Sequence, residues 1–266
     1  MDLTKLKSLR LSGNAIKIIA ALLMVVDHVG VIFFPESRIL RIIGRLSLPL
    51  FAFMISEGAK YTKNKLKYLL SLFVLGVICQ LGYLVADGGL YMCIIVSFFL
   101  SLALIFLLWE LKRAIFSDAH SCVKILLFVA LLAAIAIIYY INTVEFSKRT
   151  GLIIDYGFWG IMLPFFASIL DFRGIEVSPL LKKLDNIYAR IACMGVGVLI
   201  LSLDLINGIS GFEYIQFYSL LSLPILLLYS GERGRLRMKY FFYLFYPLHL
   251  VILYAIAIIS LYLRMK

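Results

Sequence analysis

The sequence predicts an all-α, polytopic transmembrane protein, and three observations lead to that prediction. Of the 266 residues, 63% are hydrophobic and only 15% are charged, whereas an ordinary soluble domain is about 45–50% apolar. The mean hydropathy is +1.02. Apolar runs of about the 20 residues that a helical span needs recur between short charged or Gly/Pro-marked breaks. No room is left for a separate soluble domain, so residues 1–266 are expected to form a single integral-membrane domain.

About nine spans are expected, within a range of eight to ten. The first run follows a basic stretch, as the apolar segment of a signal peptide does. However, it contains Asp27 and His28 and lacks an A-x-A-like cleavage site, so we expect it to remain in the protein as a membrane span. The second run contains Arg45 and Pro49 and the sixth is short, so either can be tilted or re-entrant. The nine runs are 15–34, 40–58, 67–86, 90–110, 123–141, 156–170, 187–206, 213–230 and 240–262.

The distribution of basic residues predicts the orientation of these spans. The net charge is +11, and 19 of the 26 Lys and Arg residues fall in segments that are cytoplasmic if the N-terminus is cytoplasmic. Cytoplasmic loops are enriched in Lys and Arg, so we expect the N-terminus inside and an odd number of spans. This explanation of the positive charge also removes the reason to expect a nucleic-acid partner. The membrane expected is a plasma membrane of bacterial type.

Cysteine usage predicts neither a disulfide framework nor a metal site. The four cysteines show no C-x-x-C spacing. Cysteines inside apolar spans usually behave as small hydrophobic side chains.

Ionisable residues inside spans are the candidate functional positions, because each costs about 2.5–3.5 kcal/mol to insert. Asp27 and His28 are consecutive and cannot face each other on one helix, so each needs a partner from another helix. Arg45 is the expected partner of Asp27, and this pair alone can have a structural role. His28 is either an interhelical hydrogen-bonding residue or a general base, because histidine titrates near neutral pH. The ionisable positions are Asp27, His28, Arg45, Glu57, Asp155 and His249.

Two further patterns favour a site that opens to both sides of the membrane. Pro247 lies two residues before His249, so a helix kink and a polar side chain coincide. Cations with nearby glycines in two expected cytoplasmic loops can hold the phosphates of a nucleotide-like donor, although the positive-inside rule also accounts for them. These cations are Lys63, Lys65, Arg233, Arg235 and Arg237.

Several segments together resemble the TraX family, membrane proteins associated with acetylation of the N-terminus of conjugative pilin. They occur in the family's order and lie mostly near the two ends of the chain. The TraX family itself is similar to transmembrane acyltransferases of the acyltransferase-3 and heparan-glucosaminide acetyltransferase types. The matching segments are 24–30, 40–53, 56–58 with 61–64, 155–157, 239–243 and 246–249.

The resemblance implies an acetyltransferase that takes an acetyl group from cytosolic acetyl-CoA and delivers it to an extracytoplasmic acceptor, such as the N-terminal amine of a pilin or secreted peptide. On this hypothesis His28 is the general base, and Asp27 and Arg45 set its environment, or Arg45 stabilises the oxyanion. Asp155, with its neighbour Tyr156, attracts the cationic amine at the outer mouth.

Further expected roles complete the site. His249 lines the acetyl path or acts as a second base, and Glu57 is included among the substrate-binding residues. The loop cations hold acetyl-CoA.

Two alternatives stay open. The acceptor can instead be a hydroxyl of a cell-surface glycan or lipid-linked sugar, because no residue here encodes peptide over sugar. A proton-coupled transporter with Asp27, His28 and Glu57 as a relay is an alternative of another class. The absence of an internal repeat in the sequence argues against the transporter.

Overall fold

The computed structural model describes residues 10–87, 90–206, 213–236 and 238–264. They are almost entirely helical, which confirms the all-α prediction. The chain divides into two compact units, which are described one by one: unit 1 comprises residues 1–54 and 201–266, and unit 2 comprises residues 55–200. The single domain expected over the whole chain stays a prediction.

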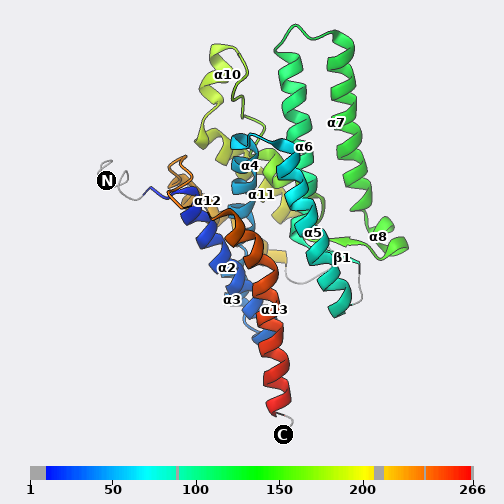
Figure 1. The fold of residues 1–266 in the computed structure, drawn as a ribbon, viewed down its shortest axis with the longest axis vertical. Helices are drawn as coiled ribbons and strands as arrows, with labels where there is room; N and C mark the ends of the chain where they lie inside the picture. The colour runs from blue at the N-terminus through cyan, green and yellow to red at the C-terminus, as the bar shows by residue number, and fades with distance from the viewer. Residues whose placement is uncertain (1–9, 88–89, 207–212, 237, 265–266) are drawn as a thin grey trace. The chain divides into compact units, whose positions relative to one another are not determined.

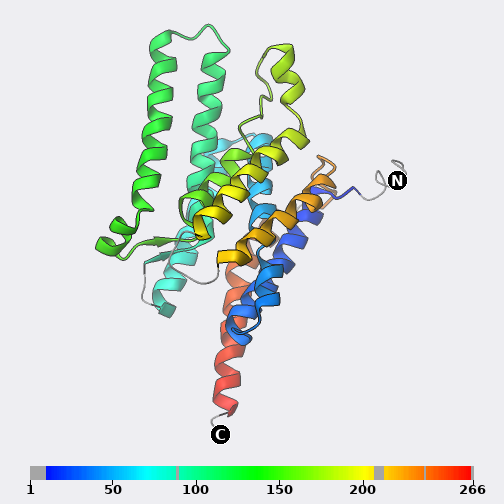
Figure 2. The same cartoon turned by 180° about the vertical axis from the view of Figure 1, so that it is seen from behind.

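Unit 1 is built around α2 (Gly13–Phe33), which packs against α3 (Arg38–Gly44) and α13 (Lys239–Arg264). These three helices lie side by side in both views (Figures 1 and 2). Ser12 caps α2 by accepting a hydrogen bond from the backbone N–H of Ala15 at 3.2 Å, which satisfies one of the free donors at a helix start. The remaining elements are the first residues of α4 (Ser47–Tyr61), the 3-10 helix η1 (Glu213–Leu221), α12 (Ser222–Leu227) and the end of α11 (Ile187–Ile206).

Unit 2 is centred on α6 (Ile94–Ile115), which packs against the helices α5, α7 and α9. Two short strands, β1 (Tyr91–Met92) and β2 (Ile153–Ile154), pair in parallel and tie the connection before α6 to the connection before α9. The other helices are α5 (Lys65–Asp87), α7 (Ser121–Ile141), α8 (Val144–Thr150), α9 (Gly157–Phe166), α10 (Pro179–Leu184) and most of α11.

Seven helices of the described residues are long and apolar enough to cross a membrane. They coincide with seven of the nine predicted runs. The other two runs form shorter apolar helices, Gly157–Phe166 and Tyr214–Leu227, so the count of nine and the orientation stay predictions. Apolar side chains are exposed along α7, where only 11% of the residues in its most apolar 18-residue stretch are buried, as expected of a helix that faces lipid. The protein is therefore a multi-pass membrane protein.

Gly44 lets α3 approach α2 closely. A Cβ atom at Gly44 would lie 2.3 Å from both Cβ and Oδ1 of Asp27, closer than any real contact. The Gly44→Ala substitution is therefore expected to destabilise the protein by about 1–3 kcal/mol, as overpacking does, and thermal unfolding in detergent measures the change. Gly82→Ala on α5 is the matched control, because a Cβ at Gly82 meets nothing within 4 Å and alanine favours helix. Equal melting temperatures of the two variants would contradict the close approach.

Candidate functional site

Two histidines that are 221 residues apart in the sequence meet in unit 1. His28 lies on α2, and His249 lies on α13 just after Pro247. Nδ1 of His28 and Nε2 of His249 are 3.4 Å apart, and the ring centroids are 5.0 Å apart with the rings inclined at 68°. The residues predicted as the catalytic base and as a lining or second base therefore form one histidine pair.

The backbone contacts of the pair indicate which nitrogen of each ring carries a proton. Nδ1 of His28 lies 2.8 Å from the carbonyl oxygen of Met24, and Nδ1 of His249 lies 2.9 Å from that of Phe245. A carbonyl oxygen only accepts hydrogen bonds, so in both neutral rings Nδ1 is the donor and Nε2 has the lone pair. Nε2 of His249 then faces the Nδ1–H of His28. The lone pair of His28 at Nε2 is the one that can take a proton.

Aromatic rings enclose the histidine pair on the α13 side. The Phe245 ring stacks on His249 with centroids 5.2 Å apart and planes inclined by only 8°. The Tyr246 ring meets His249 at 5.7 Å in an edge contact. His249 is itself buried. The pair is thereby held in one orientation, which a general base needs.

Asp27 pairs with Arg41, whereas the sequence prediction assigned Arg45 to it. Nη1 of Arg41 lies 2.7 Å from Oδ2 of Asp27, and the side chains are 17% and 15% exposed. The predicted partner was wrong by one helical turn. Arg41 lies within α3, the helix that packs against α2, whereas α3 ends at Gly44 and Arg45 is its C-terminal cap. The other carboxylate oxygen, Oδ1, is buried without a hydrogen-bond partner among the described residues.

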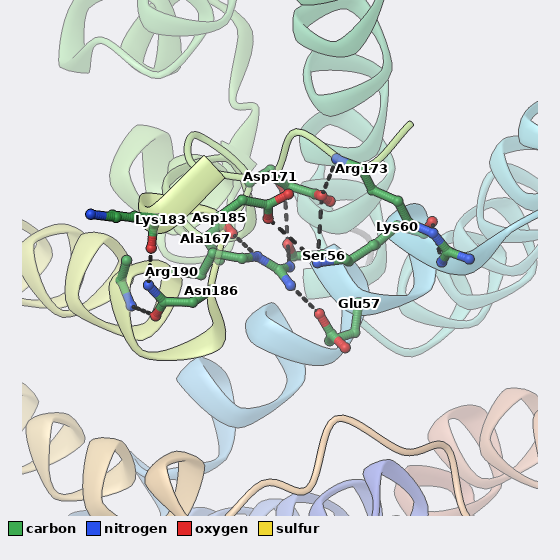
Figure 3. Close-up of polar contacts among 12 residues, drawn as sticks. Ser56, Glu57, Lys60, Ala167, Asp171, Arg173, Lys183, Asp185, Asn186 and Arg190 are labelled. Atoms are coloured by element: carbon green, nitrogen blue, oxygen red, sulfur yellow. Dashed lines mark hydrogen bonds and ion pairs between the residues drawn. The ribbon is translucent and has the colours of Figure 1, made fainter. Parts of the chain in front are cut away.

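A second charged cluster lies inside unit 2, around Arg190 on α11 (Figure 3). Arg190 is 1% exposed. Its Nε donates to the carbonyl oxygen of Ala167 at 2.9 Å, its Nη2 donates to Oγ of Ser56 at 2.8 Å, and its Nη1 pairs with Glu57. Glu57, expected among the substrate-binding residues, is thus engaged in a buried ion pair. Buried charges are tolerated when paired and hydrogen-bonded in this way.

Sequence reasoning missed Arg190. Arg190 is one of the 19 cations that the charge distribution assigns to cytoplasmic segments, although it lies inside the predicted run 187–206. An arginine within a span is the same signal that singled out Arg45. That signal was sufficient to find Arg190.

Lys112 was missed for a different reason, because α6 continues to Ile115, beyond the predicted end of that span at residue 110. Its ammonium group donates to the carbonyl oxygens of Ser168 at 2.8 Å and Asp171 at 3.0 Å. Lys60 lies near the same segment, with Nζ 3.5 Å from Oδ1 of Asp171 and 3.8 Å from Oδ1 of Asp185 (Figure 3). Together, the contacts of Lys112 and Lys60 hold the segment that follows α9 in place.

The predicted phosphate-binding cations differ in how far they are engaged. In unit 2, Lys65 pairs with Glu110 at 2.5 Å and lies 4.0 Å from the centre of the Trp109 ring, whereas Lys63 is exposed. In unit 1, Arg233 and Arg235 are exposed in the loop before α13, and Arg237 lies outside the described residues.

Asp155 and Tyr156 lie in unit 2, directly after β2 and before α9. The backbone N–H of Asp155 donates to the carbonyl oxygen of Met92 at 3.0 Å, and Oγ of Ser97 donates to the carbonyl oxygen of Asp155 at 3.0 Å. Tyr156 has a φ of 57°, the left-handed region that a non-glycine residue rarely adopts. Both side chains are half-buried.

These observations define a multi-pass helical membrane protein with a histidine pair in unit 1 and a buried ion pair, Arg190–Glu57, in unit 2. The chain belongs to the TraX family, whose members are described as "TraX protein" and which it matches over residues 12–257. It is 28% identical over 257 residues to "Probable fimbrial assembly protein FimC, serogroup H1" of Dichelobacter nodosus, covering 93% of this chain and 96% of that protein.

A shorter similarity links the chain to "Uncharacterized protein RP591" of Rickettsia prowazekii (strain Madrid E). The two are 35% identical over 68 residues, which is 26% of this chain and 25% of that protein. No solved structure matches this chain.

Proposed function

We propose that this protein is a membrane-embedded acetyltransferase that transfers the acetyl group of cytosolic acetyl-CoA to an extracytoplasmic acceptor, the N-terminal amine of a pilin or another secreted peptide. The observation that carries the proposal is the histidine pair, in which Nε2 of His28 has the lone pair for a proton. Membership of the TraX family and the similarity to a relative named for fimbrial assembly support a role in building fimbriae at the plasma membrane.

His28 acts as the general base in this proposal. When bound, acetyl-CoA supplies an activated thioester carbonyl. Nε2 of His28 takes the proton of the acceptor nitrogen as that nitrogen forms its bond to the carbonyl carbon, and the thiolate of CoA leaves. The Nδ1–H of the resulting imidazolium faces Nε2 of His249 and the carbonyl oxygen of Met24, and both acceptors stabilise the positive charge.

Two arginines lie at the end of α3, Arg41 in its last turn and Arg45 at its C-terminal cap. Arg41 is held by Asp27, the residue next to His28. We propose that Arg45 stabilises the negative charge that develops on the carbonyl oxygen during transfer, as oxyanion-stabilising donors do.

The described residues fit a phosphate-bearing donor in part. Lys63, Arg233 and Arg235 have exposed cationic side chains that can bind phosphate oxygens. Lys65 would first have to leave Glu110 and the Trp109 ring. We therefore propose Arg233 and Arg235, which belong to unit 1 as His28 does, as phosphate contacts.

Release of free CoA from acetyl-CoA by the purified full-length protein tests the proposal. Candidate peptides and sugars are added separately, and the mass of each acceptor is measured afterwards. Acceptor-dependent release with a gain of one acetyl group on a peptide amine is expected; acetylation of a sugar hydroxyl would favour the glycan alternative. If acetyl-CoA neither binds nor is cleaved, the acetyltransferase proposal fails, and uptake driven by a pH gradient in proteoliposomes tests the transporter alternative.

A further inference from the structure

We infer that Cys79 and Cys93, two buried cysteines of unit 2, are joined by a disulfide bond when the protein is in its membrane. The structure describes both as free thiols, which is the reduced form. The spacing of the cysteines in the sequence does not predict this bond; the packing of α5 against α6 brings the two side chains together. The bond is independent of the proposed acetyl transfer, so its test needs neither an acetyl donor nor an acceptor.

The two thiols are in direct contact. Cys79 lies on α5, and Cys93 is the N-cap residue of α6. Their side chains hydrogen-bond to each other, and the two residues are only 6% and 1% exposed. A thiol is a weak hydrogen-bond donor and a weak acceptor. Oxidation would therefore replace a weak interaction with a covalent bond between the same two atoms.

Neighbouring contacts place this pair in a regular antiparallel register between α5 and the start of α6. About one turn before Cys79, a Cβ atom at Gly76 would lie 3.4 Å from Cγ2 of Val96 and 3.9 Å from its backbone nitrogen. About one turn after Cys79, the ring of Tyr83 lies 5.9 Å from that of Tyr91. The two helices accordingly lie side by side (Figure 1). A disulfide needs Cα atoms within about 7 Å of each other, and the missing side chain of Gly76 allows such a close approach.

The charges at the far ends of α5 and α6 indicate on which side of the membrane the pair lies. Lys65 and Lys67 lie at the start of α5, and Lys112 and Arg113 lie in the last turn of α6, whereas residues 68–111 contain no Lys or Arg. Because basic residues are retained on the cytoplasmic side, we expect the opposite ends, which carry the two cysteines, to be extracytoplasmic. Disulfide bonds form and persist on that side of a bacterial membrane.

The oxidant in this inference is an extracytoplasmic protein or small molecule that contains a disulfide. The thiolate of Cys93 attacks one sulfur of that disulfide, which forms a mixed disulfide and releases the other sulfur as a thiolate. The thiolate of Cys79 then attacks the sulfur of Cys93, so the bond between the two cysteines forms and the second oxidant sulfur leaves. Two electrons and the two thiol protons pass to the oxidant, whose sulfurs end as thiols.

The positions of the two cysteines suit this sequence of steps. Cys93 makes the first attack because the positive end of α6 stabilises its thiolate. Since both residues are buried in the folded protein, the exchange takes place before α6 has packed fully against α5. Burial then shields the finished bond from reductants, as it does in structural disulfides.

The test counts the free thiols of the full-length protein taken directly from membranes. Cells of a bacterial host with intact extracytoplasmic thiol oxidation are quenched in acid, which stops thiol exchange, and the protein is denatured and alkylated with N-ethylmaleimide before mass spectrometry. Two alkyl groups, on Cys122 and Cys193, are expected without reductant, and all four cysteines should react after reduction. Proteolysis without reductant should yield two peptides linked through Cys79 and Cys93.

Two results of this count would overturn the inference without any variant. Four alkyl groups before reduction would show that Cys79 and Cys93 are simply small hydrophobic side chains, as buried cysteines usually are. A linked peptide pair that joins other cysteines would show that the packing of α5 against α6 does not determine the partner.

Serine substitutions test the partnership itself. Cys79→Ser and Cys93→Ser should each raise the number of alkylated thiols from two to three, because each frees the partner although the chain has lost a cysteine. Cys122→Ser, at an exposed position on α7, is the matched control and should lower the number from two to one. A count of two in Cys79→Ser would contradict the pairing. If the serine variants do not accumulate, the count on the wild-type protein decides.

Discussion

Replacing His28 with alanine is expected to lower acceptor-dependent release of CoA by about 100- to 10,000-fold, the range that a general base contributes. The substitution removes the Nε2 lone pair that takes the proton in the proposed reaction. Initial rates of CoA release by the purified variant and the wild-type protein, at saturating acetyl-CoA, measure the loss.

The chain contains a matched control for this substitution. His120, the remaining histidine of the three in the sequence, is exposed at the start of α7, so His120→Ala should retain the wild-type rate. His249→Ala should lose less activity than His28→Ala, because His249 acts through its contact with Nδ1 of His28. A His28→Ala variant that transfers acetyl at the wild-type rate would remove His28 from the chemistry.

Hydropathy was sufficient to locate the long helices but not the ends of the short ones. The run 156–170 is apolar throughout, yet its helix is only Gly157–Phe166. The left-handed backbone of Tyr156 sets where it begins, and its last residue follows Pro164 closely. Likewise, the run 213–230 begins as the 3-10 helix η1. Helix ends depend on local backbone turns, and hydropathy averaged over a run of residues carries no information about such turns.

The candidate site was predictable residue by residue but not as pairs. The cost of ionisable groups in lipid singled out Asp27, His28 and His249 separately. The meeting of His28 with His249 depends on how α2 packs against α13, and no local pattern encodes that packing. The choice of Arg41 over Arg45 as the partner of Asp27 depends on where α3 ends. Both arginines lie within one helical turn, so spacing alone could not distinguish them.

Replacing Arg190 with alanine is expected to lower the free energy of unfolding by about 3–5 kcal/mol, the usual effect of removing one partner of a buried ion pair. Arg190 is 1% exposed, and the substitution leaves the Glu57 charge buried without the guanidinium. It also removes the donors to Ser56 and to the carbonyl oxygen of Ala167. Thermal or denaturant unfolding of the detergent-purified protein measures the change, because the expected effect is on stability.

An exposed pair of the same chemistry provides the control. Arg149 pairs with Glu145 on α8, with side chains 70% and 74% exposed, so Arg149→Ala should cost no more than about 0.5 kcal/mol. The double substitution Arg190→Met with Glu57→Gln should recover much of the stability, since removing both charges also removes the cost of burying them. If Arg190→Ala unfolds like Arg149→Ala, Arg190 is solvated rather than buried. The single variant can be unstable while the double variant is no more stable. In that case Arg190 contributes to stability through its hydrogen bonds to Ser56 and Ala167 rather than by compensating the charge of Glu57.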